Sequence, residues 1–95
     1  MELGRVSNNS LIARIESALA AVRARGATAQ FLADVIRGNG RALEGMAYPL
    51  INELEKLAND LDIASWHEED EFLPDLPSIL SKVDRWLHQL PRDAA

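Results

Sequence analysis

Apolar residues recur every three to four positions in four separate segments, and this spacing restricts the possible folds more than any other feature. It places the apolar side chains of each segment on one face of a helix, whereas a strand would need them at alternate positions. No alternating run is long enough to predict a strand. The predicted buried stripes are Leu11, Ile12, Ile15, Leu19 and Val22; Phe31, Leu32, Val35 and Ile36; Leu50, Ile51, Leu54, Leu57, Ala58 and Leu61; and Ile79, Leu80, Val83, Trp86, Leu87 and Leu90.

Cap-forming and helix-breaking residues separate these segments. The first helix is expected to follow the cap formers at residues 7–10 and to stop at Gly26. Thr28 can cap the second helix, and the Gly-Asn-Gly sequence at residues 38–40 predicts a turn that ends it. Pro49 suits the first position of the third helix because its missing N–H is not needed there.

The boundaries of the last two helices are less regular. Residues 41–48 allow two alternatives, a backward extension of the third helix with a kink at Pro49 or a separate turn. Tyr48 can act as a hydrophobic staple against the third helix. Asp75 can cap the fourth helix, and Pro91 is expected to end it.

Four amphipathic helices with short connections predict an all-α, single-domain bundle in antiparallel up-down order. A chain of 95 residues fits one domain, here residues 1–95, with 1–9 expected as a loose N-terminal tail and 91–95 as a C-terminal tail. The chain has no cysteine, so its stability must come from packing rather than disulfides or thiolate metal sites. No run is apolar enough for a membrane span, and a cytoplasmic protein is expected.

Charge is divided unevenly along the chain. Residues 1–47 hold six arginines against four carboxylates, whereas residues 48–95 hold four cations against eleven carboxylates. The net charge is −5. An acidic half repels phosphate backbones and attracts basic surfaces, which disfavours direct nucleic-acid binding and favours a basic protein partner.

The acidic residues are most concentrated in residues 66–75, WHEEDEFLPD, where five of the ten residues carry a carboxylate. Such a segment can be a solvated connection, a cation loop or a decoy for a basic surface. Asp60, Asp62 and Glu71 match positions one, three and twelve of a calcium loop, but Ala64 and Ser65 fail positions five and six. His67 and His88 have no recognised metal-ligand spacing, so no metal or cofactor is expected.

Catalytic motifs are equally lacking in the sequence. The two glycines of residues 38–40 follow a predicted helix rather than a strand, which argues against a phosphate-binding loop. An exposed carboxylate run provides no cleft that would shift two pKa values apart for acid–base catalysis. We therefore expect a binding protein rather than an enzyme.

Three segments together carry a resemblance to a known family. ATAQFLADVI at 27–36, YPLINELEKLANDLD at 48–62 and DLPSILSKVDRWLHQL at 75–90, with an acidic loop before the last, are similar to small helical immunity proteins of the colicin-D and contact-dependent-inhibition types. These proteins protect bacteria from their own nuclease toxins. The resemblance implies that acidic residues occupy the basic cleft where the toxin holds RNA.

Under this hypothesis, the acidic run accelerates the encounter with the toxin and nearby aromatic residues hold the complex. The expected contact residues are Asp60, Asp62, Trp66, Glu68, Glu69, Asp70, Glu71, Phe72 and Asp75. The two aromatic residues can equally be plugs that pin the loop to the core. The rival hypothesis is a structural or regulatory module that dimerises by burying Trp86; a monomer awaiting a different partner favours the immunity protein.

Overall fold

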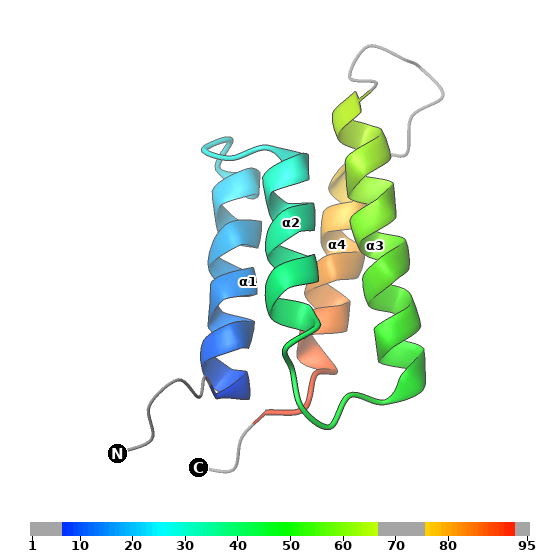
Figure 1. Ribbon diagram of the computed structural model, residues 1–95. Coiled ribbons are helices and arrows are strands. Elements are labelled where there is room, and N and C mark those ends of the chain that lie inside the picture. Colours follow the sequence, from blue (N-terminus) through cyan, green and yellow to red (C-terminus); the bar gives the residue numbers. More distant parts are fainter. Residues whose placement is uncertain (1–6, 67–75, 93–95) are drawn as a thin grey trace.

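The computed structural model describes residues 7–66 and 76–92, which form an antiparallel four-helix bundle (Figure 1). The helices are α1 (Asn8–Arg23), α2 (Ala29–Gly40), α3 (Tyr48–Trp66) and α4 (Leu76–His88). Each helix packs against its two neighbours, with α2 between α1 and α3, and α4 between α3 and α1. The prediction of an all-α bundle of four amphipathic helices is confirmed.

The predicted stripes form most of the core. All five residues of the first stripe and all six of the last are buried. The second and third stripes are partly wrong, because Phe31 is 47% exposed and Ile51 is 42% exposed. In α2 the small side chains of Ala29 and Ala33 face the core instead, and this rotation of the helix turns Phe31 outward.

The Gly-Asn-Gly sequence does not form the predicted turn, since α2 continues to Gly40. Gly40 is buried, and a Cβ atom there would meet the side chain of Leu54 and lie 3.5 Å from Cη2 of Trp86. The Asn39 side chain donates a hydrogen bond to the Val35 carbonyl at 2.9 Å, within the helix. Close packing of α2 on α3 thus outweighs the low helix propensity of glycine.

Residues 41–47 form a separate connection rather than an extension of α3, which settles the two alternatives. Gly45 has a φ of +73°, a conformation that glycine adopts without strain. α3 begins at Tyr48, one residue before the proline expected at its start. Tyr48 is 74% exposed, so the predicted hydrophobic staple is wrong.

The predicted N-terminal tail ends earlier than expected, because α1 begins at Asn8 and Ser7 is its cap. The buried Asn8 side chain donates hydrogen bonds to the carbonyl oxygens of Glu44 and Pro91, both at 2.9 Å, and accepts one from the Glu44 N–H at 3.0 Å. One amide therefore joins α1, the α2–α3 connection and the C-terminal segment. Pro91 consequently belongs to the folded domain rather than to a loose tail.

The end of α1 places an arginine in a position that usually suits glycine. Arg25 has a φ of +62°, its N–H donates to the Val22 carbonyl, and the Gly26 N–H donates to the Ala21 carbonyl at 2.8 Å. These bonds form a Schellman cap in which Arg25, not the predicted Gly26, takes the left-handed position.

Replacing Arg25 with glycine is expected to raise the free energy of unfolding by about 0.5–1 kcal/mol, because glycine adopts this backbone conformation without a Cβ clash. Urea denaturation measures the change. Arg25→Ala is the matched control, since it removes the same charge but keeps a Cβ atom. Equal stabilities of the glycine and alanine variants would contradict the backbone explanation.

Candidate partner-binding site

The predicted partner site centres on the connection between α3 and α4. The end of α3 and the start of α4, which residues 67–75 join in the sequence, lie at the same end of the bundle (Figure 1). Trp66 is the last residue of α3. The remaining predicted contacts, Glu68, Glu69, Asp70, Glu71, Phe72 and Asp75, lie outside the described residues.

Asp60 and Asp62 both lie within α3, where a separation of two residues turns their side chains to different sides. Asp60 is half-buried and lines a groove between α3 and α4. Asp62 is buried and faces α2. Helical backbone at these two positions does not form the calcium loop that their spacing suggested, and the two carboxylates do not share one surface.

Arg37 on α2 holds the Asp62 carboxylate. Its Nη2 donates a hydrogen bond to Asp62 Oδ2 at 2.5 Å, while Asp34 lies 3.9 Å from Nη1. The hydrogen bond to Asp62 is the main cause that raises the pKa of Arg37 above its ordinary value. This engagement inside the protein argues against the prediction that the Asp62 carboxylate contacts a partner.

A second ion pair joins the same two helices, about one turn further along α2 and two turns earlier along α3. Arg41, just after α2, donates two hydrogen bonds to the Glu55 carboxylate, at 3.0 and 2.8 Å. These hydrogen bonds are the main cause that lowers the pKa of Glu55. Both side chains are largely exposed, so the pair orients α2 and α3 more than it stabilises them.

Replacing Asp62 with alanine is expected to lower the free energy of unfolding by about 1–2 kcal/mol, because it leaves the half-buried Arg37 guanidinium without its main partner. The loss is small for an ion pair of this kind because Arg37 remains partly in contact with water. Chemical denaturation measures it, with Asp60→Ala as the control on the same helix. A loss as large for Asp60→Ala would show that the ion pair contributes nothing specific.

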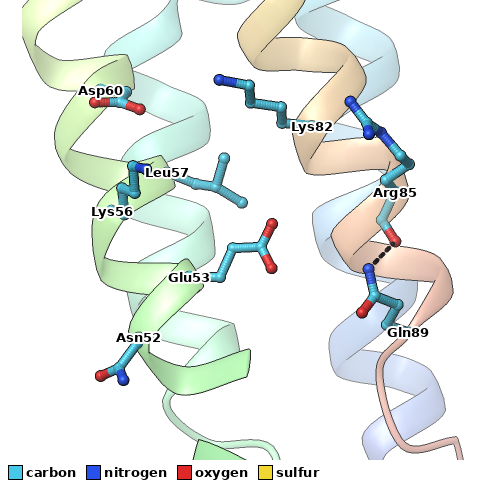
Figure 2. Close-up of a pocket in the computed structure, with 8 residues that line it drawn as sticks. All are labelled: Asn52, Glu53, Lys56, Leu57, Asp60, Lys82, Arg85 and Gln89. Atoms are coloured by element: carbon cyan, nitrogen blue, oxygen red, sulfur yellow. Dashed lines mark hydrogen bonds between the residues drawn. The ribbon is translucent and has the colours of Figure 1, made fainter. Parts of the chain in front are cut away.

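The groove that contains Asp60 has a volume of about 460 Å³ (Figure 2). Its α3 wall carries Glu53, Lys56 and Asp60, and its α4 wall carries Lys82 and Arg85. Glu53 extends from α3 toward α4, and Lys82 extends from α4 toward α3, next to Arg85. Within the part of the chain that the structure describes, none of these charged side chains forms an ion pair. Sequence reasoning missed Lys82 and Arg85, since only the alignment of α3 with α4 brings them opposite the two carboxylates.

The described residues contain no group of three or more metal-ligating side chains. His88 lies on α4 with Nδ1 2.8 Å from the Asp84 carbonyl oxygen, and His67 lies outside the described residues. Among the helices described, none is long and apolar enough to cross a membrane.

Comparison of the chain with protein-family models, curated proteins and solved structures finds no match.

Proposed function

We propose that this protein neutralises a basic nuclease toxin in the cytoplasm by binding it through the acidic connection between α3 and α4. The observation that carries the proposal is a charge block: residues 57–81 contain seven carboxylates and no lysine or arginine. Asp62 is neutralised by Arg37, which leaves six carboxylates, five of them between Trp66 and Leu76. A block of one sign is complementary to a cationic, RNA-binding surface.

The proposed roles follow from charge and aromatic content. Glu68, Glu69, Asp70 and Glu71 attract lysines and arginines of the toxin and raise the association rate. Trp66 and Phe72 anchor the complex by burying aromatic surface and slow its dissociation. Asp60, which lines the α3–α4 groove, contributes at the edge of the proposed interface. The proposal assigns no catalytic step, metal or cofactor to the protein, which inhibits by occupying the place of substrate phosphates.

A homodimeric structural module is less well supported. That hypothesis depended on Trp86 being buried between two copies, but Trp86 is fully buried within the single chain. Its Nε1–H donates to the Leu50 carbonyl at 3.0 Å, so its polar group is also satisfied internally. We therefore propose a monomer that awaits a different protein.

The test uses the purified chain as bait in a lysate of the source bacterium, with the retained proteins identified by mass spectrometry. Glu69→Lys combined with Asp70→Lys is expected to weaken binding of a retained nuclease at least tenfold, because like charges then face each other. The control combines Asp34→Lys with Asp84→Lys, which changes the net charge equally but alters α2 and α4.

Inhibition completes the test. The retained nuclease should cleave RNA alone, lose activity when the unaltered chain is added, and keep activity with the Glu69→Lys, Asp70→Lys variant. If the two double variants weaken binding equally, binding depends on the net charge of the protein and not on the acidic connection. Recovery of no nuclease by the unaltered bait would remove the proposed function.

A further inference from the structure

A second candidate binding surface lies on the opposite side of the bundle, on the outer face of α1 and α2 (Figure 1). It is a groove of about 530 Å³. From α2 come the half-exposed Phe31 and half-buried Val35; from α1 come the small residues Ser17 and Ala21. The small side chains of α1 leave room beside an exposed aromatic ring, which provides an apolar groove for another helix.

The charged side chain that lines this groove is Arg14, whose guanidinium donates a 3.5 Å hydrogen bond to the Asn39 side chain. In the described segments Arg14 has no ion-pair partner.

The carboxylates of the α1–α2 pair are engaged elsewhere. Glu16 lies 3.4 Å from Arg92, and Asp34 lies 3.9 Å from Arg37 on the side that faces α3. The groove face therefore combines apolar and positive groups although the whole chain carries a charge of −5. Its charge is opposite to that of the proposed toxin-binding segment, so the two surfaces select different partners.

We infer that the α1–α2 groove binds an amphipathic helix of a partner protein whose apolar stripe is flanked by acidic residues. The apolar stripe packs against Phe31 and Val35, and a flanking carboxylate faces Arg14. A second copy of this chain fits less well, because the apolar stripes of its described helices are mostly used in its own core.

The test measures fluorescence anisotropy of two labelled peptides of about 18 residues, or five helical turns, with the full chain. Both peptides carry the same leucine stripe, flanked by glutamates in one and by lysines in the other. The glutamate peptide is expected to bind at least tenfold more tightly. The net charge of −5 alone predicts the opposite order, and the proposed toxin site would itself favour the lysine peptide.

Variants locate the binding. Phe31→Ser and Arg14→Glu are each expected to weaken binding of the glutamate peptide about tenfold. The first removes the apolar anchor, and the second reverses the complementary charge. Tyr48→Ser is the matched control, since Tyr48 is exposed but lies at the start of α3. Circular dichroism verifies that each variant keeps its helices.

Tighter binding of the lysine peptide, or equal effects of Phe31→Ser and Tyr48→Ser, would overturn the inference. A concentration-dependent dimer that Phe31→Ser abolishes, measured by sedimentation equilibrium, would also overturn it by assigning the groove to a second copy. Failure here leaves the toxin proposal intact, because the Glu69→Lys, Asp70→Lys variant tests a different surface.

Discussion

Replacing Trp86 with alanine is expected to lower the free energy of unfolding by about 3–5 kcal/mol, the largest effect of any single substitution considered for this protein. Trp86 is fully buried on α4 among residues of all four helices. The substitution leaves a cavity and removes the donor that serves the Leu50 carbonyl. A domain of this size has a total stability of about 5–14 kcal/mol, so the variant approaches the limit of folding.

Urea denaturation followed by circular dichroism measures this loss. Trp86→Phe is expected to lose less, because it keeps most of the ring volume and loses the indole N–H. Tyr48→Ala is the control for removal of an exposed aromatic side chain and should change stability by less than about 0.5 kcal/mol. A similar loss for Tyr48→Ala would contradict the placement of Trp86 as the centre of the core.

Adding one methyl group at Gly40 is expected to have the second largest effect on the free energy of unfolding. Gly40→Ala should lower the free energy of unfolding by about 1–3 kcal/mol, although alanine gains about 1 kcal/mol in helix propensity. The new Cβ would overlap the end of the Leu54 side chain, which is 1% exposed and would have to shift out of its core position.

Gly38→Ala is the matched control on the same helix, because a Cβ there meets no atom within 4 Å. It should raise stability by up to about 1 kcal/mol, so the two glycines are expected to respond with opposite signs. A double-mutant cycle with Leu54→Ala completes the test, since the smaller residue makes room for the methyl group. A stabilising Gly40→Ala would show that α2 and α3 separate more easily than their packing indicates.

The two proposed binding surfaces divide the bundle by charge. The acidic connection joins α3 to α4 in the sequence, whereas the apolar and positive groove lies on α1 and α2. The end of α3 and the start of α4 lie at one end of the bundle (Figure 1). The Arg37–Asp62 pair and the Arg41–Glu55 pair fix α2 against α3, between these two regions. Because the surfaces differ in sign and position, variants of one should leave binding at the other unchanged.

For the candidate toxin site, the sequence shows which acidic residues are present but not how they are arranged in space. The carboxylates at 68–71 are visible in the sequence, and Asp60 remains available at the α3–α4 groove. The engagement of Asp62 could not be foreseen, because Arg37 lies 25 residues away on another helix. The groove on α1 and α2 could not be foreseen either, because the spacing of Phe31 in the sequence predicts a core position whereas the side chain is 47% exposed.

Structural features that depend only on residues close together in the chain could be predicted from the sequence alone. Periodicity of three to four predicted the four helices, and Thr28 caps α2 by accepting a hydrogen bond from the Phe31 N–H at 3.1 Å. Tertiary structure decided the continuation of α2 through Gly40, the role of Asn8 and the partner of Asp62. The difference lies in the sequence separation of the interacting residues. Helix stripes and caps arise from residues within one or two turns of each other. The other three features depend on how separate helices align and how closely they approach.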